Sequence, residues 1–403
     1  MKPALFTARE AAARLGVSLA TLYAYVSRGQ IRSQAAPGDP RSRLYAGEDV
    51  EALARKKAHR QDPARAAAEA LDWGAPVLDS ALTRIGPEGP FYRGESALEL
   101  AGKESFEKVA ALLWLDAPQA AESLFSPLDW PQPDARGCSI AALSRSLLDA
   151  AEDDLRAYDL SPESAAAAGA RILLLLAATL GAEAPKPGRG KRPGALPGRI
   201  AAGLGAAWKA EPRLLEAALV LSADHELNAS SFTARVVAGA GATPYAAVLA
   251  GLAALSGNRH GGLTPRAAAL LREVGSPGRA AQVVADRLRS GEILPGFGHT
   301  LYTDGDPRAR ALLERLAEKG HAGAADSEAL ETVREVARVV AISTGRRPNI
   351  DLALAALEVA CNLPQGAGLA LFALGRSVGL VAHAVEQYQS GRLIRPRARY
   401  VGR

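Results

Sequence analysis

Two histidines flanked by glycines constrain this chain more than any other feature. His260 lies in the segment Ser-Gly-Asn-Arg-His-Gly-Gly at residues 256–262, and His299 ends the segment Leu-Pro-Gly-Phe-Gly-His at residues 294–299. Glycine has no side chain to obstruct a turn or the close approach of a ligand. Each histidine is therefore expected at the end of a secondary-structure element, where its imidazole can face a ligand. Taken alone, each segment is better explained as a simple turn, because short motifs often match by chance.

Composition and hydrophobic spacing predict a helical protein around these histidines. Hydrophobic residues make up 48% of the chain but aromatic residues only 5%, which favours Ala, Leu and Val on helices over a sandwich or barrel. Helices are expected at residues 164–180, 267–274 and 278–289, and a short hairpin at residues 80–94. Residues 183–198 are rich in Pro, Gly and basic side chains, and we expect a mobile surface loop there.

The cysteines and the apolar runs of the sequence indicate the cellular compartment in which the protein is expected. The two cysteines, Cys138 and Cys361, form neither a metal-binding spacing nor a disulfide framework. A reducing, cytoplasmic compartment is therefore the expectation. No N-terminal apolar segment with a cleavage site is apparent, and no apolar run is predicted to be long enough to span a membrane.

Further motifs extend the two histidine segments into an ordered series. They are Asp-His-Glu-Leu-Asn-Ala-Ser at residues 224–230, Asp-Pro-Arg at 306–308, Arg-Pro-Asn-Ile-Asp at 347–351, Leu-Gly-Arg-Ser-Val-Gly-Leu-Val-Ala-His at 374–383 and Ile-Arg-Pro-Arg at 394–397. The series resembles the citrate synthase family, from roughly residue 71 to the C-terminus. Such a run of ordered motifs is hard to match by chance.

The resemblance implies a reaction in which the methyl carbon of an acyl thioester attacks the ketone of a 2-oxo diacid. It assigns Asp351 as the base that removes the methyl proton, His260 as the stabiliser of the enol and His299 as the group that polarises the ketone. A carboxylate in a dry pocket is a stronger base, and a histidine held neutral can donate to an enolate oxygen. The implied substrates are coenzyme A thioester and oxaloacetate, with no metal and no tightly bound cofactor.

The diacid calls for several cations. By resemblance these are His225, Arg308 and Arg376, with Arg395 reaching in from the second subunit of a homodimer. Guanidinium groups match carboxylates bidentately and keep their charge when buried. Arg376 lies inside the apolar run 369–384, where a buried arginine needs a partner.

The chain departs from the family pattern around these motifs. Thr303 stands where relatives commonly carry a basic residue for a coenzyme A phosphate, and Arg259 replaces an apolar residue. Leu263-Thr264 replaces the usual Ala-Asn, and residues 352–354 lack the polar or aromatic residues that usually follow the aspartate. The leading expectation from the resemblance is condensation of acetyl-CoA with oxaloacetate to give citrate, and the nearest alternative is propionyl-CoA, the substrate of 2-methylcitrate synthases.

The basic charge of the chain is concentrated at its N-terminus. Residues 1–60 carry 11 Lys/Arg against 5 Asp/Glu, whereas the remainder carries 37 against 38. Such asymmetry favours a polyanionic partner for the N-terminal segment. Thr7 and Glu10 form a predicted capping box, Ser18 is expected to cap a second helix, and a wing is expected from residues 31–36 and 43–46.

This segment resembles the winged helix-turn-helix of MerR and excisionase proteins. The resemblance implies duplex DNA as a possible partner, with a helical protein-interaction module as the alternative. In the DNA-binding interpretation the second helix enters the major groove and the wing reaches phosphates. The candidate DNA contacts are Arg28, Arg32, Arg41 and Arg43.

The expected architecture is all-α, a citrate synthase fold with an N-terminal winged helix-turn-helix. The winged helix occupies residues 1–60 and a linker residues 61–65. The large helical domain comprises residues 66–259 and 362–403, and a smaller mobile domain comprises residues 260–361. An alternative function is a regulator that binds DNA and uses the synthase body as a metabolite sensor.

Overall fold

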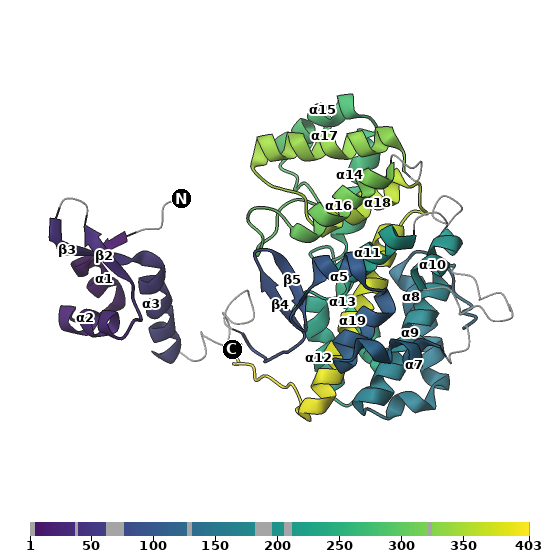
Figure 1. The fold of residues 1–403 in the computed structure, drawn as a ribbon, viewed down its shortest axis with the longest axis horizontal. Helices are drawn as coiled ribbons and strands as arrows, with labels where there is room; N and C mark the ends of the chain where they lie inside the picture. The colour runs from purple at the N-terminus through teal and green to yellow at the C-terminus, as the bar shows by residue number, and fades with distance from the viewer. Residues whose placement is uncertain are drawn as a thin grey trace. The chain divides into compact units, whose positions relative to one another are not determined.

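The computed structural model describes residues 5–36, 39–61, 76–126, 131–181, 196–204, 212–320 and 325–402. Backbone contacts divide the chain into two units, residues 1–79 and 80–403, each with a hydrophobic core of its own. Figure 1 shows the two units, the first built of short helices and a small sheet, the second mostly of helices. Most of the predicted linker, residues 62–65, lies outside the described residues.

The first unit is a winged helix-turn-helix. Its helices are α1 (Ala8–Leu15), α2 (Leu19–Ser27) and α3 (Gly47–Gln61), and its antiparallel sheet has the order β1-β3-β2, with β1 (Leu5–Thr7), β2 (Ser33–Ala36) and β3 (Asp39–Ala46).

Local sequence signals set the ends of these helices. The predicted capping box is confirmed, since Thr7 accepts from the Glu10 backbone and Glu10 accepts from the Thr7 backbone. Gly16 ends α1 with φ of 59°, a left-handed conformation that glycine adopts without strain. Ser18 caps α2 as predicted. Strand β1 was not predicted, because three residues carry too little periodicity to be recognised.

The second unit begins with a small antiparallel sheet. Strands β4 (Thr83–Gly86), β5 (Gly89–Tyr92) and β6 (Glu95–Ser96) pair in that order, which confirms the predicted hairpin and adds a third strand. The helices of the first half of this unit are α5 (Ala97–Lys103), α6 (Phe106–Leu115), α7 (Ala121–Phe125), α8 (Ile140–Asp153), α9 (Pro162–Thr179), α10 (Leu196–Leu204), α11 (Pro212–Ser222), α12 (Ala229–Gly239) and α13 (Pro244–Leu255), with 3-10 turns η1 (Pro118–Ala120) and η2 (Leu155–Tyr158).

The second half of this unit is also helical. It contains α14 (Leu263–Val274), η4 (Pro277–Arg279), α15 (Ala280–Arg289), α16 (Pro307–Gly320), α17 (Ser327–Thr344), α18 (Ile350–Ala360) and α19 (Ala367–Ser390). In Figure 1, α14 to α18 gather at one end of the unit. These helices belong to residues 260–361, the predicted smaller domain. The exact domain limits and any hinge motion stay predictions.

Helix α19 is the centre of the second unit. It packs against α9, α11, α12, α13 and α18, and close approach depends on glycine: a Cβ on Gly375 would lie 2.7 Å from the Leu219 carbonyl oxygen. Contrary to the prediction, α19 is long and apolar enough to cross a membrane; Arg376 and His383 interrupt its apolar run and hide this in the sequence. Since 94% of its most apolar window is buried, α19 is the core helix of this unit.

One predicted loop is partly wrong. Residues 196–198, the end of the predicted loop 183–198, form the start of α10. The helix continues through Ile200 and Ala201, which are fully buried. Burial of these apolar side chains stabilises the helix, which therefore includes residues 196–198. Residues 182–195 lie outside the described residues.

Candidate active site

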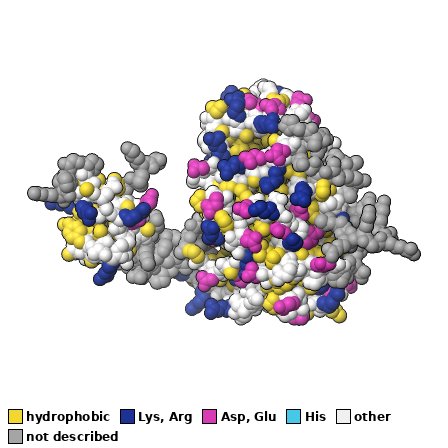
Figure 2. Space-filling model, in the orientation of Figure 1, with side chains coloured by type: hydrophobic (Ala, Val, Ile, Leu, Met, Phe, Trp, Pro, Cys, Tyr) yellow, Lys and Arg dark blue, Asp and Glu magenta, His cyan; other side chains and the backbone are white. Residues whose placement is uncertain are grey.

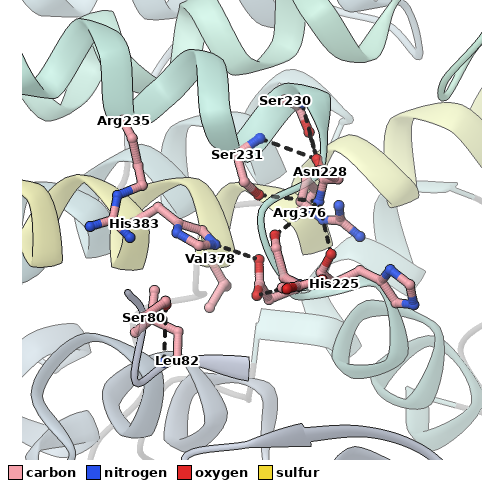
Figure 3. Close-up of polar contacts among 12 residues, drawn as sticks. Ser80, Leu82, His225, Asn228, Ser230, Ser231, Arg235, Arg376, Val378 and His383 are labelled. Carbon is pink, nitrogen blue, oxygen red and sulfur yellow. Dashed lines mark hydrogen bonds and ion pairs between the residues drawn. The ribbon is translucent and has the colours of Figure 1, made fainter. Parts of the chain in front are cut away.

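Six of the predicted site residues come from the ends of helices and from the core helix α19. His225 lies in the turn between α11 and α12, His260 in the turn before α14, and His299 in the segment after α15. Arg308 and Asp351 lie in the first turns of α16 and α18, and Arg376 in the middle of α19. Figure 3 shows His225 and Arg376 together with the residues that begin α12.

The turn that carries His225 is held by the cap of the next helix. Asn228 caps α12 by accepting from the backbone N–H groups of Ser230 and Ser231 at 3.0 and 3.1 Å. Glu226 adopts a φ of 55°, a left-handed conformation that costs energy for a residue with a Cβ. The cap and the strained residue together fix the direction in which His225 leaves the turn.

Three rings meet at His225. Its Nε2 lies 3.1 Å from the Tyr302 hydroxyl, and its ring centroid is 5.3 Å from that of His299. The His299 and Tyr302 centroids are 4.8 Å apart. Burial, followed by the charges of Arg308 and Arg376, lowers the pKa of His225 well below its usual value, so this ring is neutral near pH 7.

His299 has a defined hydrogen-bonding state. Its Nδ1 accepts from the Leu301 backbone N–H at 3.1 Å, so in the neutral ring the proton is on Nε2. Burial and the positive charge of Arg308 lower the pKa of His299 to about 4, although Asp306 acts in the opposite direction. His299 is thus a neutral donor at Nε2.

His260 lies in a tight glycine turn directly before α14. Its backbone N–H donates to the Gly257 carbonyl at 2.9 Å, and a Cβ on Gly262 would lie 2.8 Å from that same oxygen. The Nε2 of His260 is 3.0 Å from the Ser230 hydroxyl. Burial and the charge of Arg376 lower the pKa of His260 to about 4, so this histidine is also neutral near pH 7.

The segment before His299 packs against the segment before Asp351. Phe297 and Pro348 form an antiparallel bridge, and the Gly298 N–H donates to the Arg347 carbonyl at 2.8 Å. Asn349 caps α18, and its Nδ2 donates to the Gly298 carbonyl at 3.0 Å. The same asparagine therefore positions both the helix that carries Asp351 and the turn that carries His299.

Asp351 is a buried carboxyl with a raised pKa. The residue is 8% exposed, and Oδ1 accepts from the Thr264 hydroxyl at 2.5 Å. Burial raises the pKa of Asp351 to about 6, against the opposing effects of Thr264 and of Arg308. A carboxylate with such a pKa is ionised near pH 7 and is a stronger base than an exposed one.

Arg308 is held by a carboxylate of its own motif. Its Nε and Nη2 donate to Asp306 at 3.0 and 2.8 Å, and both residues are 2% exposed. Asp306 also accepts from the Ile350 N–H at 3.1 Å. Arg308 was predicted to bind the diacid, but its bidentate pair with Asp306, which fixes the guanidinium beside the start of α18, was not predicted.

Arg376 has the partner that its burial requires. Its Nε donates to the Ser222 carbonyl at 3.0 Å, whereas Nη1 is buried and has no hydrogen-bond partner among the described residues. Nearby, the fully buried His383 lies 3.3 Å from the Asp224 carboxylate (Figure 3). The position of His383 beside Asp224 fits a structural role.

The structure does not test the role predicted for Arg395. This residue is exposed in the extended segment that follows α19, whereas Arg308 and Arg376 are buried. An exposed arginine at this place is compatible with a contribution to a second subunit, and that contribution stays a prediction.

The N-terminal arginines differ in their surroundings. Arg28 and Arg43 are exposed, whereas Arg32 donates to Asp49 through Nε at 2.9 Å and Nη2 at 2.8 Å. The side chain of Arg41 lies outside the described residues. In the view of Figure 2 both signs of charge are interspersed over the larger unit. DNA contact by these four arginines stays a prediction.

Sequence comparison bears on this arrangement directly. The family profile described as citrate synthase, C-terminal domain, matches residues 138–397. The chain belongs to the citrate synthase family. A second profile, described as a helix-turn-helix domain, matches residues 5–58, in agreement with the fold of the first unit.

Individual relatives agree with the family assignment. A citrate synthase of Haloferax volcanii is 38% identical over 186 residues, 46% of this chain and 49% of that protein. A 2-methylcitrate synthase of Mycobacterium tuberculosis is 29% identical over 358 residues, 82% of this chain and 89% of that protein. The chain thus spans about half the length of several curated relatives that it matches.

Solved structures show the same fold. The citrate synthase of Thermoplasma acidophilum, solved as a ternary complex with carboxymethyl coenzyme A and oxaloacetate, superposes with a TM-score of 0.68 at 23% identity. The match covers 82% of this chain and 94% of that one. The predicted all-α citrate synthase fold is confirmed.

Several residues of this site had been given no role from the sequence. Thr264, Ser230 and Asp306 each bond a predicted site residue directly. Each lies within or beside a quoted motif, so proximity to the motifs was the available signal. No sequence signal could identify Ser222, whose carbonyl accepts from Arg376, because every residue has a carbonyl.

Proposed function

We propose that the chain condenses an acyl-coenzyme A thioester with oxaloacetate, giving citrate or an alkyl-substituted citrate and free coenzyme A. The observation that carries this proposal is the setting of Asp351. Its carboxyl is buried, its pKa is raised to about 6, and its pKa responds to the same two arginines, Arg308 and Arg376, as that of His225. A base poised near neutral pH beside two cations suits carbanion chemistry on a dianionic substrate.

The first step is proton transfer from the methyl carbon of the thioester to Asp351. His260 stabilises the enol oxygen with a ring N–H, without first losing a proton, because its pKa is about 4. In the structure the Ser230 hydroxyl donates to Asn228 Oδ1 at 2.7 Å, and its oxygen lies 3.0 Å from His260 Nε2. The enol role requires that this hydroxyl turn to donate to His260 Nε2, so that the ring proton is on Nδ1 and can face the enol oxygen.

The second step forms the new carbon–carbon bond. The enol carbon attacks the ketone carbon of oxaloacetate, and His299 polarises the ketone oxygen by a hydrogen bond from Nε2. The alkoxide that forms takes up one proton, which balances the proton that Asp351 removed from the methyl carbon, and hydrolysis of the resulting thioester by water releases coenzyme A. Since both histidines are neutral, each donates a hydrogen bond and neither adds a positive charge to the site.

Binding of the diacid is assigned to His225, Arg308 and Arg376 from one chain and Arg395 from a second subunit. The Nη1 of Arg376, which has no hydrogen-bond partner within the described ranges, and the forked guanidinium geometry favour a carboxylate ligand. This assignment makes the functional unit a homodimer or a larger assembly. The ternary complex of the Thermoplasma acidophilum relative contains the same class of ligands.

The proposal is tested by release of free thiol from acetyl-CoA and from propionyl-CoA, each with and without oxaloacetate. Release that requires oxaloacetate and disappears in Asp351→Asn supports the condensation. Release independent of oxaloacetate would identify a thioester hydrolase instead.

A 2-methylcitrate synthase is the second candidate. It is favoured by the 2-methylcitrate synthase of Mycobacterium tuberculosis, whose alignment extends over 82% of this chain. The ratio of kcat/KM for propionyl-CoA and acetyl-CoA in the same assay separates the two candidates.

A regulatory role is favoured by a different observation, the basic winged helix-turn-helix. The predicted second helix, α2, contains no Lys or Arg, so base contacts would come from its polar and apolar side chains and phosphate contacts from Arg28 and the wing. A sensor needs the diacid-binding arginines but not the base Asp351. Retention of Asp351 with a raised pKa therefore favours an enzyme that carries a DNA-binding unit over a sensor without activity.

A further inference from the structure

Thr264 is a fully buried hydroxyl at the edge of the site. It is the second residue of α14 and has 0% exposure. Its hydroxyl donates to Oδ1 of Asp351 at 2.5 Å, joining α14 to α18, which pack against each other. Thr264 lies four residues after His260. One short segment therefore contains the proposed enol stabiliser and also bonds the proposed base.

The two carboxylate oxygens of Asp351 are not equivalent. Oδ1 is taken by Thr264, whereas Oδ2 receives no hydrogen bond in the part of the chain that the structure describes. We propose that Thr264 is a positioning residue that fixes Oδ1 and leaves Oδ2 as the oxygen that accepts the substrate proton. This inference rests on the proposed role of Asp351 as the base.

The Thr264 hydroxyl is one of several groups that shift the pKa of Asp351. Burial raises the pKa of Asp351, while Thr264, Arg308 and Arg376 lower it and Asp306 raises it further. His260, in the turn before α14, has a pKa of about 4 and is uncharged near pH 7. Of the groups that lower the pKa, Thr264 alone is uncharged and bonds the carboxylate directly, so its removal tests one contact without removing a cation from the diacid site.

The side chain at this position must satisfy two demands. It must fit a closed space, since Thr264 is buried among α14, α18 and the start of α19, where a Cβ on Gly368 would lie 3.2 Å from its methyl group. It must also donate a hydrogen bond. Valine meets the first demand only, whereas serine meets the second and leaves a methyl-sized gap.

The experiment compares Thr264→Val and Thr264→Ser with the parent in pH profiles of kcat and kcat/KM. In Thr264→Val, loss of the donor should move the acid limb of kcat/KM upward by about one to two pH units, the value of a hydrogen bond to a charged group. The kcat should fall roughly tenfold to a hundredfold because the carboxylate is no longer aligned. The KM for oxaloacetate should change little, and Thr264→Ser should restore the parent's pH profile.

Thr332→Val is the matched control. Thr332 is a buried threonine of α17 whose hydroxyl donates to the Glu328 carbonyl at 2.8 Å, so this variant also loses a buried hydroxyl but touches no site residue. It should leave the pH profile unchanged. An unchanged profile in Thr264→Val, or equal shifts in Thr264→Val and Thr264→Ser, would overturn the inference while leaving the role of Asp351 intact.

A second readout separates this inference from the proposed function. If the parent shows no condensation activity at all, the proposed function fails, and titration of the carboxyl still tests the contact. Carbon-13 NMR of aspartate-labelled protein reports each carboxyl, and the signal lost in Asp351→Asn identifies the one of interest. A signal that titrates at the same pH in parent and Thr264→Val would show that Thr264 does not act on Asp351.

Discussion

Replacement of Asp351 by Asn should abolish turnover and stabilise the fold at the same time. A carboxylate buried in an active site serves chemistry at the expense of stability. The amide of Asn has the same shape and can still accept from Thr264, but it carries no charge and cannot take the methyl proton. The two effects therefore come from one property of the native side chain, its buried negative charge.

The size of the stability gain follows from the pKa of Asp351. The folded protein holds it at about 6, against a usual value of 3.8. Because the folded state binds the proton more tightly than the unfolded state, the associated stability is fully present below pH 3.8 and is lost as pH rises through about 6. A difference of about 2 pKa units corresponds to about 3 kcal/mol. The variant should be more stable than the parent by up to that amount at pH 7.5, and by only about a third of it at pH 4.5.

The activity of the parent should follow the same titration. Only ionised Asp351 is a base, so kcat/KM should rise with pH and level off above an apparent pKa of about 6. At pH 5 about one tenth of the carboxyl is ionised, against more than nine tenths for a carboxyl of ordinary pKa. His260 and His299 have pKa values of about 4, so their protonation lies below this window.

Urea unfolding of parent and variant at several pH values measures the stability, and thiol release measures the activity. Asp306→Asn is the matched control, because the Arg308 charge holds the pKa of Asp306 below its usual value despite burial. It should lose stability at pH 7.5, since it leaves Arg308 without its partner. Turnover by Asp351→Asn within tenfold of the parent, or a variant less stable than the parent at pH 7.5, would refute the reasoning.

Three further predictions concern the diacid, the second subunit and the N-terminal unit. Oxaloacetate should raise the thermal unfolding temperature of the parent but not of Arg376→Leu, because the diacid supplies a partner for the buried guanidinium. Calorimetry measures both temperatures, and equal shifts in the two proteins would exclude Arg376 as a ligand of the diacid. Co-expressed Arg395→Ala and Asp351→Asn chains, each inactive alone, should form heterodimers with partial activity, and verified heterodimers without activity would argue against a shared site. The full chain should bind duplex DNA with an affinity that weakens steeply with salt, and deletion of residues 1–61 should remove this binding and leave turnover unchanged. Fluorescence anisotropy with a palindromic and a random duplex measures the binding. If the full chain does not bind DNA even at low salt, the winged helix is an interaction module.

Helix ends were the most predictable part of the fold. The predicted capping box of Thr7 and Glu10 and the predicted cap at Ser18 act through hydrogen bonds between residues three apart. Such local chemistry is written in the sequence and does not depend on the rest of the chain. The same is true of the turn that places His260 directly before α14.

Partners distant in sequence were not predictable. Thr264 and Asp351 are 87 residues apart, and Arg376 and the Ser222 carbonyl 154 apart. Resemblance to a family supplied the identity of the site residues but not these contacts, since Thr264 departs from the family pattern. The pKa of Asp351 could not be foreseen either, because it depends on burial by helices that come together only in the folded chain.

The arrangement of charge in the site explains why the base and the diacid ligands lie on different elements. Arg308 is joined to Asp306, and Asp306 accepts from the first N–H of α18, so the start of the helix that carries Asp351 is fixed to one of the two buried arginines. Arg376 is fixed separately, through the Ser222 carbonyl at the end of α11. A diacid that contacts both arginines therefore connects α16 and α18 with α11 and α19.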